Sequence, residues 1–218
     1  MALYVFDAYG TLFDVHAAAE REKDAIGATW LELSRTWRTK HIEYSWHHAF
    51  TGKPATFWQL AERSLDYAIA ATGGGVSGEV RGRLLASYRT MAAYPEVRAV
   101  LAALKARGDT LAILSNGDPD MLDDAVRAAG LDGLFDAVLS VSAAATFKPQ
   151  MKVYQLVLDR FGGKPGDVSF QSSNRWDIAA AKAFGFRCVW VNRTGAPDEY
   201  PELAPDVVAK DLRALLTA

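Results

Sequence analysis

The sequence has very little cysteine and no long apolar run. Cys188 is the one cysteine among 218 residues, which excludes an intramolecular disulfide and a metal cluster held by several thiolates. No stretch approaches the roughly 18 consecutive apolar residues that a membrane-spanning helix needs. The N-terminus also lacks a charged leader followed by a long apolar segment, so a reduced cytoplasm is the expected location.

Neither sign of charge is in excess. The chain has 24 Lys and Arg against 26 Asp and Glu, a formal net charge of -2. This balance offers no basic field for nucleic acid and no polybasic patch for a membrane surface. The histidines do not have the spacing of a known metal motif, so no metal is expected; they are His16, His41, His47 and His48.

Short apolar runs alternate with helical patterns over most of the chain. Residues 3–6 form an apolar run that ends at Asp7, which is typical of a buried parallel strand. After Pro95 the expected strands are 110–115, 135–141, 167–171 and 188–192, and the expected helices are 97–106, 120–129, 153–161 and 176–184. Such alternation predicts an α/β fold with a doubly wound, Rossmann-like parallel sheet.

The segment between the first strand and the rest has a different pattern. Residues 15–90 show helical spacing without a convincing strand, and the glycine-rich stretch 72–78 divides them into at least two pieces. We therefore expect a helical cap domain, residues 15–94, inserted into an α/β core made of residues 1–14 and 95–218.

Polar side chains follow four of the expected strands. They lie in DAYGT from Asp7, SNG from Ser115, FKP around Lys148 and SSNRWD from Ser172. Ligands of an open parallel sheet bind beyond the carboxyl ends of its strands. These stretches would therefore bring two carboxylates, a lysine, hydroxyls and an amide to one site.

Each stretch also has an explanation that involves no function. Asp7 would cap the turn at Gly10, and Asn116 with the following glycine is a common turn dipeptide. Lys148 would be a solvated loop residue, and the polar residues before Trp176 would cap a helix. These explanations are independent, whereas a single site accounts for all four stretches, so we favour the site.

Arg38 is ambiguous in the same way. Alone it fits an exposed position on an amphipathic helix. It lies, however, on a stripe with Ile42, Ser45 and Ala49 that carries few charges, which favours a face turned towards the protein.

Together the motifs resemble the haloacid dehalogenase superfamily, and specifically its (S)-2-haloacid dehalogenases. The segments that carry the resemblance run nearly end to end and are FDAYGTLFDV, WRTKHIEYSW, AILSNGDPDM, FKP with the following VY, SSNRWD and NRTG. The resemblance implies hydrolysis of short (S)-2-haloalkanoic acids to (R)-2-hydroxyalkanoic acids and halide. It implies no cofactor, a 2-haloacid substrate with water and halide as the other ligands, and a homodimer.

The resemblance also implies roles for individual residues. Asp7 would attack C2 of the substrate and form an ester that water then hydrolyses. The other catalytic residues implied are Lys148, paired with Asp7; Thr11 and Tyr154, which fix this pair; and Ser172, Asn174 and Asp177, which hold the hydrolytic water.

Substrate and halide contacts are implied in the same manner. The substrate carboxylate would be bound by Ser115 and the backbone near Ala8 and Tyr9, the halide by Arg38 and Asn116, and an apolar wall would consist of Tyr9, Ile42, Phe57 and Trp176. Arg175 departs from the usual pattern of the family, and it would either point to solvent or alter the size and charge of the pocket.

Position 9 separates the possible activities. Phosphatases of the superfamily typically carry a second aspartate there to protonate the leaving group, and further acids to hold magnesium. This chain has Tyr9, and its segment SSNRWD offers Asp177 as the only acid. A halide leaves without a proton, so dehalogenation is favoured over a magnesium-dependent phosphatase. A non-catalytic small-anion binding protein on the same scaffold is the other alternative.

Overall fold

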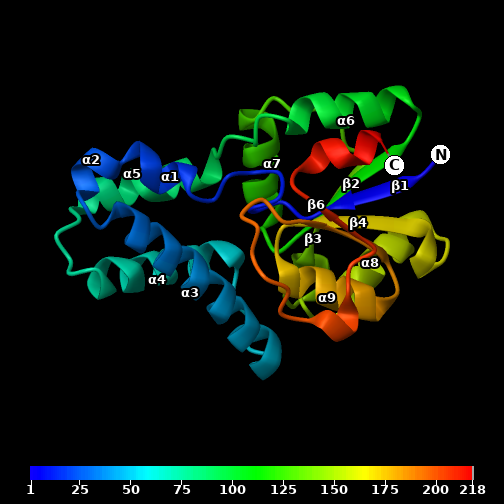
Figure 1. Ribbon diagram of the computed structural model, residues 1–218. Helices are drawn as coiled ribbons and strands as arrows, with labels where there is room; N and C mark the ends of the chain where they lie inside the picture. The colour runs from blue at the N-terminus through cyan, green and yellow to red at the C-terminus, as the bar shows by residue number, and fades with distance from the viewer. Residues whose placement is uncertain (218) are drawn as a thin grey trace.

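The computed structural model describes residues 1–217 and has a six-stranded parallel sheet at its centre (Figure 1). The strands are β1 (Leu3–Phe6), β2 (Thr110–Ser115), β3 (Ala137–Ser140), β4 (Val168–Ser172), β5 (Arg187–Val191) and β6 (Val207–Ala209), in the order β3-β2-β1-β4-β5-β6. All pairs are parallel, and Val5 of β1 lies between Ala112 and Phe170. The predicted doubly wound parallel sheet is confirmed.

Four helices connect the strands. They are α6 (Val97–Ala106), α7 (Pro119–Ala128), α8 (Met151–Phe161) and α9 (Arg175–Phe184). In Figure 1, α6 lies on one face of the sheet, and α8 and α9 lie on the other. Burial explains the arrangement, since α6 turns Val97, Val100, Leu101 and Leu104 towards the core at the i, i+3, i+4, i+7 spacing of an amphipathic helix. The strand order reverses at β1, which makes its carboxyl end the switch point where ligands bind in such sheets.

A second group of helices forms a lobe beside the sheet (Figure 1). It contains α1 (Ala17–Arg21), α2 (Lys23–Ile26), α3 (Trp30–Thr51), α4 (Phe57–Ala71) and α5 (Gly78–Arg89), with no strand between them. The chain enters and leaves the lobe through two paired segments, because Tyr94 N–H donates to Leu12 O (2.9 Å) and Asp14 N–H donates to Ala92 O (3.0 Å). The predicted helical insertion is present, and its division at residues 14/15 and 94/95 stays a prediction.

Some local elements differ from those expected. The third strand ends at Ser140 because the chain turns into a 3-10 helix (Val141–Ala144), whose first turn is capped by the Ser140 hydroxyl accepting the Ser142 N–H. The edge strand β6 was not predicted. It has three residues, and Val208 in its middle is 59% exposed, so its sequence shows no buried apolar run. Three further 3-10 helices, Pro165–Asp167, Pro201–Leu203 and Leu212–Leu216, were also not predicted.

Among residues 1–217, no helix is both long enough and apolar enough to span a lipid bilayer.

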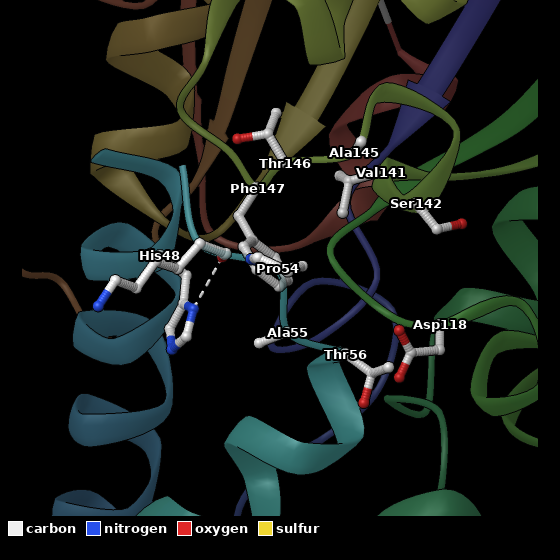
Figure 2. Close-up of a pocket in the computed structure, with 11 residues that line it drawn as sticks. His48, Pro54, Ala55, Thr56, Asp118, Val141, Ser142, Ala145, Thr146 and Phe147 are labelled. Atoms are coloured by element: carbon white, nitrogen blue, oxygen red, sulfur yellow. Dashed lines mark hydrogen bonds between the residues drawn. The ribbon is translucent and has the colours of Figure 1, made fainter. Parts of the chain in front are cut away.

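Asp118 joins the lobe to the sheet domain. This residue precedes α7 but does not cap it; instead its two carboxylate oxygens accept the N–H groups of Phe57 (3.1 Å) and Trp58 (2.8 Å). The Thr56 hydroxyl accepts the next N–H, from Gln59 (3.1 Å). Figure 2 shows Asp118 beside Thr56 at one side of a cleft of about 180 Å³. The unpaired N–H donors at the start of α4 are therefore satisfied largely by a side chain of the sheet domain.

We expect Asp118→Ala to lower the free energy of unfolding by about 0.5–2 kcal/mol, because it removes the acceptors from a helix N-terminus. Asp120→Ala is the matched control, since Asp120 forms an exposed pair with Arg89 (2.7 Å) that contributes about 0–1 kcal/mol. Urea unfolding of the two variants measures the difference. An equal loss in both would contradict the capping role of Asp118.

Candidate active site

Asp7 lies directly after β1, at the switch point of the sheet, and is 6% exposed. Its Oδ1 accepts a hydrogen bond from Lys148 Nζ (3.1 Å). Its Oδ2 accepts from Thr11 Oγ1 (3.0 Å), Asn174 Nδ2 (2.8 Å) and Ser172 Oγ (3.3 Å). Four donors from three different segments therefore fix the orientation of this carboxylate.

A tight turn places Thr11 beside Asp7. Gly10 has φ +91°, in the left-handed region, and a Cβ there would lie 3.2 Å from Ser173 Oγ. Glycine is therefore the residue that this turn accepts most easily. The N–H groups of the following residues converge on the carbonyl of Ala8, which brings the Thr11 hydroxyl back towards Asp7.

Lys148 is 1% exposed and bridges two carboxylates. Its Nζ lies 3.1 Å from Asp7 Oδ1 and 2.8 Å from Asp177 Oδ2, and Tyr154 donates to Asp177 Oδ1 (2.7 Å). Burial opposes the charge of Lys148, but Asp177 and Asp7 outweigh it, so the pKa of Lys148 is raised. Burial, followed by the charge of Asp7, raises the pKa of Asp177 against the opposing effect of Lys148. The cluster is a lysine that stays charged between two buried acids.

Arg38 reaches the site from the helical lobe. Its Nη2 donates to the Tyr9 carbonyl (2.9 Å) and to Asn174 Oδ1 (3.3 Å). Both acceptors are neutral, and no carboxylate within residues 1–217 forms an ion pair with this side chain. The alternative of an ordinary exposed arginine is wrong. Arg38 brings an unneutralised positive charge to the site.

Ser115 and Asn116 follow β2 and close another side of the site. The buried Ser115 hydroxyl accepts the N–H of Gly117 (3.1 Å), and Asn116 Oδ1 accepts the N–H of Lys148 (2.9 Å). The Asn116 amide nitrogen donates to no group in the part of the chain that the structure describes. This N–H₂ group is available to an anionic ligand.

These groups enclose a small pocket. The residues that line it are Asp7, Tyr9, Arg38, Ile42, Phe57, Ser115, Asn116, Lys148, Asn174 and Trp176. Its volume is about 10 Å³, enough for about one water molecule. The lobe contributes Arg38, Ile42 and Phe57, so the pocket exists only where the lobe meets the sheet domain.

The predicted site residues fall into two sets. One set lines the pocket and is given above. The other lies behind it and consists of Ala8, Thr11, Tyr154, Ser172 and Asp177, which are all fully buried. The structure thus brings all fifteen predicted residues to one place. The role of each in a reaction stays a prediction.

Both expectations for Arg175 are wrong. Its side chain is only 4% exposed, and it does not line the catalytic pocket. Nε donates to Asp198 Oδ1 (2.6 Å), and Nη2 donates to the carbonyls of Tyr200 (2.5 Å) and Leu203 (3.1 Å). The guanidinium also lies over the rings of Trp190 and Tyr200. Arg175 ties the C-terminal segment 198–203 to the start of α9.

Sequence reasoning missed two residues that support the pocket wall. His41 Nε2 donates to the Phe57 carbonyl (3.0 Å), so its Nδ1 accepts from the Tyr88 hydroxyl (3.1 Å). Burial, helped by the charge of Arg38, lowers the pKa of His41 to about 3. Tyr88 stacks on Tyr9 at 5.6 Å between ring centroids. A neutral histidine among the mixed polar and apolar residues of α3 gives no distinctive signal in the sequence.

Within the described chain, no group of three or more His, Cys, Asp or Glu side chains is arranged to hold a metal ion.

Comparison with known proteins places this geometry in a family. The model of the haloacid dehalogenase-like hydrolases matches residues 1–185. The chain is 45% identical to (S)-2-haloacid dehalogenase 1 of Pseudomonas sp. (strain CBS-3) over 196 residues, which cover 90% of this chain and 86% of that protein.

Solved structures of dehalogenases also resemble this chain closely. A crystal structure of a dehalogenase with an intermediate complex superimposes with a TM-score of 0.97 at 38% identity, covering 100% of this chain and 96% of that one. The L-2-haloacid dehalogenase from Xanthobacter autotrophicus with chloropropionic acid covalently bound gives a TM-score of 0.85 at 36% identity, covering 99% and 97%. The protein therefore belongs to the haloacid dehalogenase-like hydrolases.

Proposed function

We propose that this protein is an (S)-2-haloacid dehalogenase that converts short (S)-2-haloalkanoic acids and water into (R)-2-hydroxyalkanoic acids and halide. The observation that carries the proposal is the opposition of Asp7, held by Lys148, to the unneutralised guanidinium of Arg38 across one small pocket. A relative that is 45% identical over most of both chains carries the same activity in its name.

The first step is displacement at carbon. Asp7 attacks C2 of the substrate opposite the halogen, forming a C–O bond as the carbon–halogen bond breaks. The halide leaves with the bonding electron pair, and C2 is inverted. Arg38 and the free amide N–H₂ of Asn116 stabilise the negative charge that develops on the halogen.

The substrate carboxylate needs its own donors. Ser115 lines the pocket, and the N–H groups of Ala8 and Tyr9 have no acceptor within residues 1–217. These donors hold the carboxylate at the end of β1, which fixes the face of C2 that Asp7 meets. This is the physical basis for selecting the (S) enantiomer.

The second step is hydrolysis of the ester. Water attacks the carboxyl carbon of Asp7, and the bond between that carbon and the substrate oxygen breaks. Ser172, Asn174 and Asp177 hold the water, while Lys148 stabilises the charge that develops on the ester carbonyl. Asp7 is regenerated as a carboxylate with one oxygen from water. The hydroxyacid leaves with the original Asp7 oxygen, which takes up one proton of the water, and the other proton is released to solvent.

The helical lobe completes the pocket in this proposal. Residues 15–94 act as a cap domain on a core of residues 1–14 and 95–218. Ile42 and Phe57 from the cap face Tyr9 and Trp176 across the pocket, and these apolar side chains exclude competing nucleophiles.

Chloride release is the direct test of the activity. Purified protein treated with EDTA should still release chloride from (S)-2-chloropropionate, because a neutral carbon centre needs no divalent cation. The (R) enantiomer should remain unchanged. Absence of chloride release, together with magnesium-dependent hydrolysis of p-nitrophenyl phosphate, would instead identify a phosphatase. Equal rates of chloride release from both enantiomers would contradict the proposal that the substrate carboxylate binds in a single position.

We expect kcat/KM to fall at an acid limb and at an alkaline limb. The acid limb follows protonation of Asp177, whose pKa burial raises, so it lies above the ordinary aspartate value of about 3.9. The alkaline limb follows deprotonation of Lys148, whose pKa is raised because Asp177 and Asp7 outweigh burial, so it lies above the ordinary lysine value of about 10.4. An acid limb below the ordinary aspartate value, or an alkaline limb below the ordinary lysine value, would contradict this assignment.

The homodimer also stays part of the proposal. Exposed aromatic side chains of the lobe support it, most clearly Phe50 near the end of α3, which is 91% exposed. Light scattering of the wild type and of Phe50→Asp tests whether this surface joins two copies. The cytoplasmic location stays a prediction from the sequence.

A further inference from the structure

A second, much larger cavity adjoins the catalytic pocket. Its volume is about 350 Å³, against about 10 Å³ for the pocket itself. Three side chains line both spaces: Arg38, Asn174 and Trp176. These residues form the partition between them, so a small movement of this partition would join the pocket to a space open to solvent.

The cleft in Figure 2 does not have this relation to the pocket. It lies between residues 53–56 of the lobe and residues 141–147 of the sheet domain, and it shares no lining residue with the catalytic pocket. Phe147 lines this cleft and packs against Phe57 of the pocket wall, with 6.3 Å between ring centroids. Two packed phenylalanine rings therefore lie between this cleft and the catalytic pocket.

The larger cavity has a positive inner end. Arg38 lies there without a carboxylate partner within residues 1–217. The start of α9 lies there too: Asn174 makes no side-chain cap, and the N–H groups of Arg175 and Trp176 have no acceptor in the described structure. A guanidinium and the open N-terminus of a ten-residue helix both attract anions.

The other charged groups around the cavity are mostly compensated. Arg175 pairs with Asp198, and Arg193 pairs with Glu96 (2.7 Å) and donates to the Thr11 carbonyl (2.9 Å). Burial lowers the pKa of His16, which keeps this side chain neutral near pH 7. Among residues 1–217, the one acid that lines the cavity is Glu199, an exposed residue. The uncompensated charge at the inner end is therefore that of Arg38.

We propose that this cavity is the passage through which anions reach and leave the catalytic pocket, with Arg38 at its inner end. Its ligands are small monovalent anions, namely the carboxylate form of the substrate on entry and the halide on release. This inference rests on the proposed function. A halide held by Arg38 would enter the passage without crossing the apolar wall formed by Ile42 and Phe57.

Cysteine accessibility tests the charge of the passage. Thr194 is exposed and lines the cavity, so Thr194→Cys places a thiol there. The native thiol of Cys188 does not interfere, because burial, followed by the charge of Asp206, raises its pKa to about 12. The variant is treated in separate reactions with a methanethiosulfonate reagent that carries an anionic sulfonate and with one that carries a cationic trimethylammonium group. The rate at which each reagent modifies the thiol is measured without substrate, and the ratio of the two rates is taken.

Two control variants accompany it. Thr90→Cys places a thiol at an exposed position that also follows a paired arginine, Arg89, but lines neither cavity. Ser142→Cys places a thiol in the cleft of Figure 2. We expect the ratio of anionic to cationic modification rates to be about fivefold higher at position 194 than at position 90, because an uncompensated positive charge speeds the anionic reagent and slows the cationic one.

The labelled variants then test the route. A label at position 194 should lower kcat/KM for (S)-2-chloropropionate, labels at positions 90 and 142 should not, and dithiothreitol should restore activity. Equal reagent ratios at positions 194 and 90 would overturn the positive passage. Slower turnover with the label at 142 but not at 194 would place the route in the other cleft. Absence of dehalogenation in the unlabelled enzyme would contradict the proposed function instead, and the reagent ratio would still decide the charge of the passage.

Discussion

Asp7→Asn should reduce turnover of (S)-2-chloropropionate by about 10⁴-fold or more. An amide is a far weaker nucleophile than a carboxylate, and no other carboxylate lines the pocket as the structure describes it. Asn has the same shape, and its oxygen still accepts hydrogen bonds from two of the groups around it, Thr11 and Ser172. The loss should therefore appear in kcat while the fold is retained.

Asp14→Asn is the matched control, because Asp14 belongs to the same motif. Its carboxylate accepts the N–H of His16 (2.9 Å) near the start of α1 and does not line the pocket. Its kcat should stay within a few-fold of the wild type, as expected for a residue that only shapes the entry to the lobe. Steady-state chloride release and circular dichroism of both variants give the comparison. Wild-type turnover by Asp7→Asn would remove Asp7 from the mechanism.

Lys148→Met should cost both activity and stability. It leaves Asp7 and Asp177 side by side without a counter-ion in a site where the lysine is 1% exposed. Breaking a buried ion pair by removing one partner costs about 3–5 kcal/mol in the free energy of unfolding. Loss of the positive charge beside the nucleophile and the ester should lower kcat by about 10³-fold.

Two further variants separate the two effects. Lys152→Met removes an exposed lysine from the first turn of α8 and should change neither quantity. Lys148→Met combined with Asp177→Asn removes one of the two unpaired acids, so it should recover part of the stability but none of the activity. Urea unfolding and chloride release measure both. A stable Lys148→Met variant would show that the lysine is not needed to balance the two carboxylates.

The sheet could be predicted from the sequence because its central strands are buried on both faces. Parallel strands covered by helices require continuous apolar runs, and the run ending at Asp7 and the run ending at Ser115 both have this form. The edge strand β6 lacks that requirement, because Val208 faces solvent, and the sequence there carries no such run.

The candidate site was predicted for a similar reason. Polar groups at the carboxyl ends of neighbouring parallel strands must meet, so Asp7, Ser115 and Ser172 converge whatever the details of packing. Arg175 could not be placed in this way. Its partners, Asp198 and the Tyr200 carbonyl, lie in an irregular segment whose path is set by tertiary contacts rather than by a periodic pattern.

The cavity beside the pocket was also beyond the sequence. It depends on how closely the lobe approaches the sheet domain, and Arg38 from α3 meets Asn174 at the start of α9 across that interface (3.3 Å). Helical periodicity indicated which face of α3 turns inward, but it carried no information on the distance between the two lobes.

The central claim is that hydrolysis passes through an ester on Asp7, and oxygen-18 tests it most directly. One turnover is run with enzyme in excess in oxygen-18 water, and the hydroxyacid and the peptide containing Asp7 are both analysed by mass spectrometry. Product stereochemistry cannot replace this measurement, because direct attack of water on C2 would invert the centre as well. The account predicts heavy oxygen in the Asp7 carboxylate and an unlabelled hydroxyacid. A labelled hydroxyacid with an unlabelled peptide would contradict it and would make Asp7 a general base.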